Sequence, residues 1–405
     1  MVESTYLKVI FRTTKGNAVR LIVVMALTAI SMTIITGIGT LAPRMRNAIA
    51  ILEGRSPASI AQIEGIAEAV ERISYIFPIF FMAITALIIY MTMTRLIESE
   101  RGKIGCLKML GYPSAKIIAN YMLFIFIGSI VGSVIGIIIG YFIVSPALFA
   151  AVRGGLNIPN VENVFPLIGI ISATIMLIFA LIITFVISFK TASERITNLY
   201  KGKAPKTGSK ILFERIPFLW NKLKYKYKST LRNIFRYRVR FVMTIFSILF
   251  STALVFCGLA LSFALQHTNP DIINTIRPIS AIIIIAAILL NILVIYNITN
   301  INIEDRKREI ATLMVLGYRN KEVTGYIFRE IFLLTVLGIL IGLPIGYAAM
   351  ILMFDYLAFG GIEYVSFLVW PITAFLILVS LGLVNLMLFK KLLKTDMNGA
   401  LKIIE

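Results

Sequence analysis

The sequence has few of the residues that carry catalysis, metal binding or disulfide bonds. Cys106 and Cys257 are its only cysteines, and His267 is its only histidine. Cys106 is expected in a loop and Cys257 in an apolar segment, so no disulfide is predicted between them. The motifs Gly-x-x-x-x-Gly-Lys-Ser/Thr, His-Glu-x-x-His and Gly-x-Ser-x-Gly are absent. We therefore predict no enzyme: no catalytic residue, no metal site and no cofactor held by this chain.

Charged residues are also scarce. They make up 15% of the chain against 59% hydrophobic residues, whereas a soluble domain carries about a quarter charged residues. The net charge of +20 would suggest nucleic acid in a soluble protein, but the sequence has no basic patch interleaved with aromatic residues. Basic loops held near anionic membrane lipid are the preferred interpretation, and no nucleic-acid partner is predicted.

Apolar stretches long enough to cross a hydrocarbon core of about 30 Å occur eight times. Segments in lipid must satisfy their own backbone hydrogen bonds, which favours helices here because the alternating pattern of a barrel is missing. The prediction is an all-α membrane protein with eight transmembrane helices. The expected spans are 21–41, 75–94, 117–148, 166–189, 241–265, 279–300, 323–354 and 367–389.

The orientation follows from the distribution of Lys and Arg. Segments on the side of the N-terminus hold 34 of the 40 basic residues, so the positive-inside rule places both termini in the cytoplasm. The longest outer connection, residues 42–74, is expected to form a helix that starts at Ser56-Pro57 and runs into the second span. A plain helical extension without a site is the favoured interpretation of that segment.

The chain contains an internal repeat. A shift of 206 positions places residues 98–112 on 304–318, and a looser match places 7–12 on 231–236. Both halves have an even number of spans and start on the same side, so the repeat is parallel. The predicted units are a four-span unit at 1–200, a basic amphipathic cytoplasmic linker at 201–240 that lies on lipid, and a second four-span unit at 241–405.

Two stripes of glycines spaced four apart recur in the third and seventh spans. Such stripes let another helix backbone approach closely. Static packing is the preferred interpretation, and a sliding or pore-lining seam is the alternative. The stripes are Gly128, Gly132, Gly136 and Gly140 in one half, and Gly338, Gly342 and Gly346 in the other.

The best-defined candidates for function are two matching connections, called here the first turn (residues 100–111) and the second turn (residues 308–317). Gly111 and Gly317 suit a helix C-cap in the left-handed conformation. The leucines of the turns either pack beneath them or fit a partner's groove, so two copies of one soluble protein could dock symmetrically. Two ordinary solvated turns are the alternative.

The spans themselves are nearly free of ionisable residues, apart from Arg329 and Glu330 near one end of the seventh. Carriers coupled to protons or ions usually keep acidic or histidine side chains inside the bundle. Their scarcity argues against ion coupling and favours an external source of energy.

At the two turns the sequence resembles the FtsX-like permeases of ABC transporters, the MacB-type group. Arg308-Glu-Ile-Ala-Thr-Leu-Met-Val-Leu-Gly317 matches their signature, and Lys103-Ile-Gly-Cys-Leu-Lys-Met-Leu-Gly111 matches it with Lys103 in place of the usual Glu. The resemblance implies two copies of a cytoplasmic ABC ATPase as partners, with ATP and Mg held by that ATPase. It implies that the turns are its docking elements. The residues concerned are Glu100, Lys103, Ile104, Leu107, Leu110, Gly111, Arg308, Glu309, Ile310, Leu313, Leu316 and Gly317.

The resemblance suggests a permease subunit that couples ATP hydrolysis by the partner to movement or extraction of a hydrophobic or amphipathic substrate, a peptide or a lipid. One alternative is a mechanotransmitting signalling or scaffold subunit that controls an extracellular partner, and another is an ATP-independent carrier. Residues 215–236 are similar to large two-domain members of Gram-positive bacteria, so the expected location is their plasma membrane. The large outer domain usual in the family is missing, since the corresponding segments are only 42–74 and 266–278.

Overall fold

The computed structural model describes residues 17–52, 57–156, 158–200, 228, 231–232, 234–235, 238–264, 270–305, 310, 312, 315, 317, 320–357 and 361–393. This part of the chain contains eight helical segments long and apolar enough to cross a membrane, which confirms the predicted spans. They are Ala18–Ala50, Ile60–Ser99, Ser114–Leu156, Leu167–Ala192, Phe241–Ala264, Ile273–Glu304, Phe328–Tyr356 and Val369–Phe389. The predicted linker at 201–240 lies almost entirely outside the described residues.

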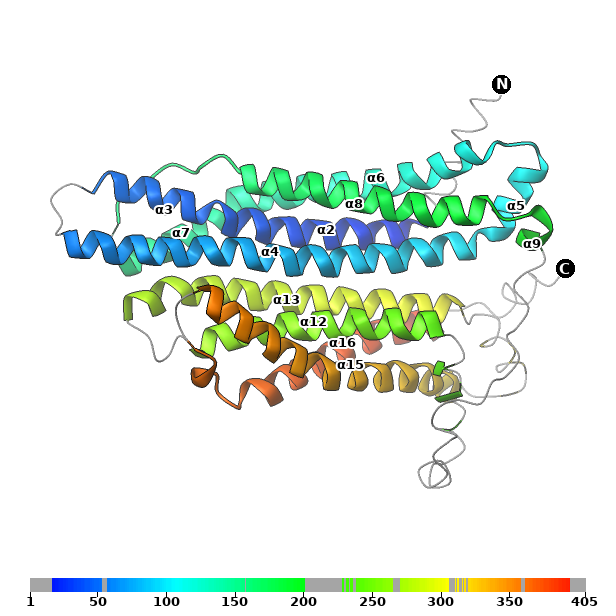
Figure 1. Ribbon diagram of the computed structural model, residues 1–405. Helices are drawn as coiled ribbons and strands as arrows, with labels where there is room; N and C mark the ends of the chain where they lie inside the picture. Colours follow the sequence, from blue (N-terminus) through cyan, green and yellow to red (C-terminus); the bar gives the residue numbers. More distant parts are fainter. Residues whose placement is uncertain are drawn as a thin grey trace.

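The long helices of the first half lie side by side as a bundle (Figure 1). Short helices flank them: α5 and α9 lie at one end of the bundle, called here the α5 end, and α3 lies at the opposite end, the α3 end. Its elements are α2 (Ala18–Gly39), α3 (Leu41–Ala50), α4 (Pro57–Ser99), α5 (Arg101–Met109), α6 (Ser114–Ile139), a π-helical turn η1 (Gly140–Val144), α7 (Ser145–Leu156), α8 (Leu167–Ala192) and α9 (Ile196–Tyr200).

The second half repeats this arrangement beside the first, with the helix axes of both bundles roughly parallel (Figure 1). Its elements are α12 (Arg238–Ala264), α13 (Pro270–Asp305), α15 (Asn320–Leu357), a short 3-10 helix η4 (Ile362–Tyr364) and α16 (Val369–Leu393). The most extensive packing is α2 on α6 in the first half and the equivalent α12 on α15 in the second. The parallel four-helix repeat predicted from the sequence is therefore present.

Each half has a buried polar pair between its first and second spans. Ser31 Oγ lies 2.7 Å from Thr85 Oγ1 between α2 and α4. In the second half, Ser251 Oγ donates to Asn291 Oδ1 at 2.9 Å between α12 and α13. Thr85 and Asn291 are 206 positions apart, whereas the serines are 220 apart, so the first span of each unit follows a different register from the rest of the repeat.

Helix α4 is longer than a bilayer core requires. Its 43 residues correspond to roughly 65 Å at 1.5 Å per residue, about twice the thickness of the hydrocarbon. It begins at Pro57 and runs without a break through the second span, which confirms the predicted helical extension. Ile63, Ile66 and Val70 of the extension are buried, so it packs on the bundle instead of standing free.

A buried arginine organises the α3 end of the first half. Arg44 Nε and Nη2 donate to the carbonyl oxygen of Val161 at 3.0 and 2.6 Å, and Nη1 donates to Asn163 Oδ1 at 2.9 Å. Its guanidinium also lies 3.9 Å from the centre of the Phe149 ring. Asn163 Nδ2 in turn donates to the carbonyl oxygen of Tyr141 in η1 at 2.7 Å. This cluster fastens the connection before α8 to α3 and to the π-helical turn.

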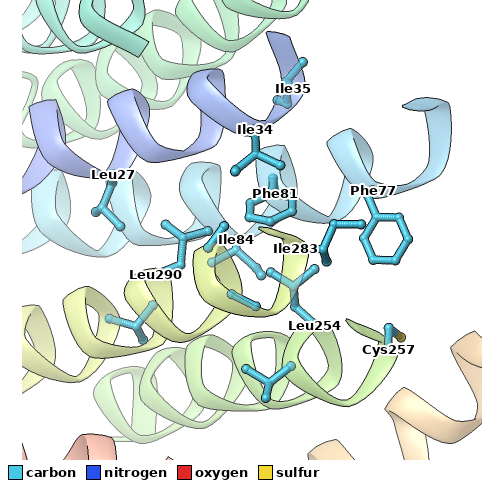
Figure 2. Packing of buried hydrophobic residues seen from close by; sticks show 14 of the residues in the cluster. Leu27, Ile34, Ile35, Phe77, Phe81, Ile84, Leu254, Cys257, Ile283 and Leu290 are labelled. Carbon is cyan, nitrogen blue, oxygen red and sulfur yellow. The ribbon is translucent and has the colours of Figure 1, made fainter. Parts of the chain in front are cut away.

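The two halves meet along a mostly apolar seam. Figure 2 shows Phe77, Phe81 and Ile84 of α4 beside Ile283 and Leu290 of α13, with α2 and α12 on either side. All five side chains are almost completely buried in one continuous core. The hydrogen bond from Asn297 Nδ2 to Thr92 Oγ1, at 2.9 Å, lies within this core.

Candidate functional site

The first turn is a short helix closed by a left-handed glycine. Helix α5 ends at Met109, and Gly111 follows with φ of 82°. The N–H of Gly111 donates to the carbonyl oxygen of Lys108 at 3.1 Å, and the N–H of Tyr112 to that of Leu107 at 3.0 Å. This pair of bonds is a Schellman motif, so the conformation predicted for Gly111 is confirmed.

The second turn is described at Ile310, Thr312, Val315 and Gly317. Gly317 has φ of 88°, which repeats the left-handed conformation at the equivalent position and confirms that part of the prediction. The other predicted docking residues of this turn, Arg308, Glu309, Leu313 and Leu316, lie outside the described residues.

Each turn has a buried isoleucine and an exposed apolar side chain. Ile104 and Ile310, which are 206 positions apart, are both buried. Met109 is 55% exposed and the equivalent Val315 is 62% exposed, while Leu110 is 75% exposed. Large apolar side chains this open, beside a glycine that ends the helix, form a small apolar surface that a partner could cover.

Leu110 was among the predicted docking residues, whereas Met109 and Val315 were not. Both residues directly precede Leu-Gly in the repeat. Because methionine and valine are different residues, an alignment of the two turns does not mark this position as shared. Leu107, which was also predicted to dock, is half-buried and packs against the apolar core. In the first turn, Leu107 therefore lies on the face that packs on the bundle, whereas Met109 and Leu110 lie on the exposed face.

Glu100 ties the first turn to the membrane bundle. Its Oε1 accepts hydrogen bonds from Asn17 Nδ2 and Lys103 Nζ, both at 2.8 Å, and its Oε2 accepts one from the Tyr121 hydroxyl at 2.9 Å. These partners come from the residue before α2, from α5 and from α6, and the Glu100 side chain is buried. Lys103, the departure from the family pattern, thus has a local partner in Glu100.

Arg20 extends this network into the second half. Its Nη2 forms an ion pair with Glu304 Oε2 of α13 at 2.8 Å. Its Nη1 donates to Asn17 Oδ1 at 3.2 Å and to Ser99 Oγ at 3.0 Å. The guanidinium of α2 therefore touches the ends of both helices, α4 and α13, that lead into the two turns.

Helix α5 is also held against the end of α8. Arg101 forms an ion pair with Glu194. Lys108 Nζ donates to the carbonyl oxygen of Ala192 at 2.5 Å and to that of Glu194 at 2.9 Å. A cation on the last carbonyls of a helix satisfies their hydrogen bonds and complements the helix dipole. A displacement of α5 would therefore act on α8 directly.

The glycine stripes lie inside each half and not between the halves. A Cβ on Gly132 would lie 2.5 Å from the carbonyl oxygen of Met25 in α2, and one on Gly342 would lie 2.8 Å from Thr252 Cβ in α12. Gly128, Gly136 and Gly140 likewise face α2, and Gly338 and Gly346 face α12. These contacts are the close α2–α6 and α12–α15 packing seen in the fold.

With this geometry established, comparison with known protein families is informative. The profile of the FtsX-like permease C-terminal domain matches the chain twice, at residues 75–197 and 281–396, which together are more than half of its length. The chain belongs to the FtsX-like permease family. Neither the comparison with curated proteins nor the one with solved structures gives a match.

Membership of the family makes this chain a transmembrane permease subunit of the ABC transporter type, not itself an ATPase, in a family whose members partner with ABC ATPases. The two matches include both turns and the helices on either side of them, whereas α2 and α12 lie outside the matches. The family resemblance stated from the turns alone is therefore confirmed, together with the presence of two FtsX-like units in one chain.

The charged side chains described at the α5 end mainly join one element to another. Among the described residues, no three His, Cys, Asp or Glu side chains lie close enough together to hold a metal ion. The charged groups of the FtsX-like permease that are gathered at the α5 end serve mainly to fix α5 to α2, α6, α8 and α13. The repeat also reverses the charges at two positions of the turns, because Glu100 and Lys103 correspond to Arg306 and Glu309.

Proposed function

We propose that this permease binds one copy of an ABC ATPase at each of its two turns and couples ATP hydrolysis there to movement or extraction of a hydrophobic or amphipathic substrate, a peptide or a lipid. The observation that carries the proposal is the repeated surface of the turns. Met109 and Leu110 in the first turn and Val315 in the second are exposed apolar side chains, each placed just before a left-handed glycine. Two equivalent surfaces fit two equivalent partners.

The apolar seam between the halves supports a substrate of low polarity. Phe77, Phe81 and Leu290 fill this seam, and Asn297 and Thr92 satisfy each other within it. This packed seam offers a charged or strongly polar substrate little to replace its hydration, a loss that costs several kcal/mol. A peptide or lipid that stays partly in the bilayer avoids that cost.

Co-purification of the permease with an ABC ATPase from the same cells tests the docking surface. Leu110→Asp and Met109→Asp each place a carboxylate on the surface of the first turn and are expected to lower recovery of the ATPase from two copies per permease to one, because the second turn is unaltered. Ile51→Asp is the matched control, because Ile51 is 59% exposed at the α3 end, away from both turns. Equal recovery of the ATPase with all three variants would refute docking at the first turn.

A second candidate function, control of an extracellular partner, is favoured by the long outer part of α4. Glu64 and Glu68 are exposed on it, while Ile63 and Ile66 beneath them are buried. Deleting the segment would expose this core, so surface substitutions are the better test. If Glu64→Lys and Glu68→Lys together leave ATPase binding intact but remove an outer protein from the purified complex, this second function is supported. If no outer protein copurifies with the unaltered chain, control of an extracellular partner is ruled out.

A further inference from the structure

A continuous chain of polar contacts joins the first turn to the second half of the molecule. It runs from Glu100 at the start of α5 to Asn17, from Asn17 to Arg20, and from Arg20 to Glu304 at the end of α13. The Asn17 amide is the link, since its Nδ2 donates to Glu100 while its Oδ1 accepts from Arg20. Helix α13 then leads into the second turn, so the contacts bridge the two docking elements.

The contacts in this chain are shielded from water. The side chains of Arg20 and Glu100 are only 7% and 5% exposed, and that of Glu304 is 22% exposed. Ionic hydrogen bonds gain strength where water is excluded, and a buried charge that loses its partner becomes unfavourable. Each member therefore depends on the next for its orientation.

We propose that Arg20 and Glu304 are positioning residues for the first turn, acting on α5 from the opposite half through Asn17 and Glu100. The inference rests on the proposed function for the meaning of α5 as a docking element. It adds that the two docking elements are not independent: a shift of α13 caused by a partner on the second turn changes the orientation of α5. Two ATPase copies would then sense each other through the permease as well as through their own contact.

The specific claim concerns Glu304. Neutralising it removes the charge that balances the Arg20 guanidinium, whose other partners Asn17 and Ser99 are uncharged, and the buried cation must find a new counter-ion or move toward water. Because Asn17 contacts both Arg20 and Glu100, this movement disturbs the support of α5. The effect should appear in α5 even though Glu304 is 204 positions away in the sequence from Glu100.

The native thiol of Cys106 allows this to be measured on the permease alone. Cys106 is an exposed free cysteine in α5, whereas Cys257 is buried. A nitroxide spin label on Cys106, with Cys106→Ser as the background control, reports the mobility of α5 by electron paramagnetic resonance in nanodiscs. The variants are Glu304→Gln and Arg20→Gln, with Glu100→Gln as the positive control. Glu363→Gln, which removes an exposed charge from the second half at the α3 end, is the matched control.

The expected result is that Glu304→Gln and Arg20→Gln at least double the mobile fraction of the label, as Glu100→Gln does, while Glu363→Gln leaves it unchanged. The double variant Arg20→Gln/Glu304→Gln should give no larger effect than either single one, because both act on one contact.

Thermal unfolding measured in parallel separates this local effect from general loss of structure. A general loss of structure would also increase the mobility of a label on the outer position Ile51→Cys. The proposal is overturned if the label on Cys106 stays immobile in Glu304→Gln, or if the label at position 51 responds as strongly. No ATPase is present, so a failure of docking leaves this result untouched.

Discussion

At the scale of single residues, a left-handed glycine closes the first turn. A Cβ on Gly111 would meet no atom within 4 Å, so a substitution there is opposed only by the backbone conformation at φ of 82°. We expect Gly111→Ala to destabilise the protein by about 1 kcal/mol, the usual cost of placing a side chain in this conformation. Thermal unfolding in detergent measures it.

Gly102 supplies the matched control within the same helix. It also has open space around its Cβ position, but it lies inside α5, where alanine is the better helix former by up to about 1 kcal/mol. Gly102→Ala is therefore expected to leave stability unchanged or raise it. Equal destabilisation by both substitutions would contradict the conformational explanation.

Single residues were predictable where backbone geometry alone sets the choice. Gly111 and Gly317 were recognised because only a glycine tolerates the left-handed C-cap without strain. Arg44 was not recognised, because its burial depends on Asn163 and the Val161 carbonyl, more than 110 positions away. Hydropathy patterns carry no information about such a distant partner.

At the scale of elements, Arg44 joins α3, the connection before α8 and η1. Losing its hydrogen bonds and its stacking on Phe149 leaves the Val161 carbonyl without its arginine donor and leaves Asn163 Oδ1 with the Ser145 hydroxyl in place of two donors. We expect Arg44→Gln to destabilise the protein by about 3 kcal/mol, the range for removing one side of a buried ionic hydrogen-bond group. The measurement is again thermal unfolding in detergent.

Arg46 is the natural comparison, two residues further along α3. It is exposed and pairs with Glu71 at the surface, and such pairs contribute about 0 to 1 kcal/mol. Arg46→Gln should therefore have little effect. A loss of stability as large as that of Arg44→Gln would show that the buried cluster is not what holds α3 in place.

Most elements could be predicted because a membrane span has one strong signature, an apolar run of sufficient length. The helix from Pro57 into the second span also followed from its N-terminal signal and apolar spacing. The π-helical turn η1 was not foreseen, since it depends on one additional residue in a turn and leaves no pattern in the composition. The burial of Ile104 and the exposure of Met109 and Leu110 could not be predicted either, because they depend on the surrounding helices.

At the scale of the whole molecule, orientation in the membrane remains a prediction from the basic residues. The exposed Cys106 tests it without any engineered site. A membrane-impermeant maleimide should label Cys106 in inverted vesicles but not in intact cells, because the α5 end is predicted to face the cytoplasm. Ile51→Cys in a Cys106→Ser background should show the opposite pattern. Labelling of Cys106 in intact cells would reverse the proposed topology.

The two-unit architecture was accessible from the sequence through the shift of 206 and the two matching turns. The contacts between the units were not, because Arg20 and Glu304 are 284 positions apart and nothing in their local sequence pairs them. The register of the first span of each unit was likewise not predicted from the sequence. Ser31 and Ser251 align at a shift of 220, which becomes visible only when each is seen beside its partner on the second span.

The number of ATPase copies that bind is the most direct test of the account. Native mass spectrometry of the permease with an ABC ATPase that copurifies with it should show two copies on the unaltered chain. Met109→Asp and the equivalent Val315→Asp should each leave one copy, and the double variant none. Two copies still bound to the double variant would contradict the claim that these paired turns are where the ATPase docks.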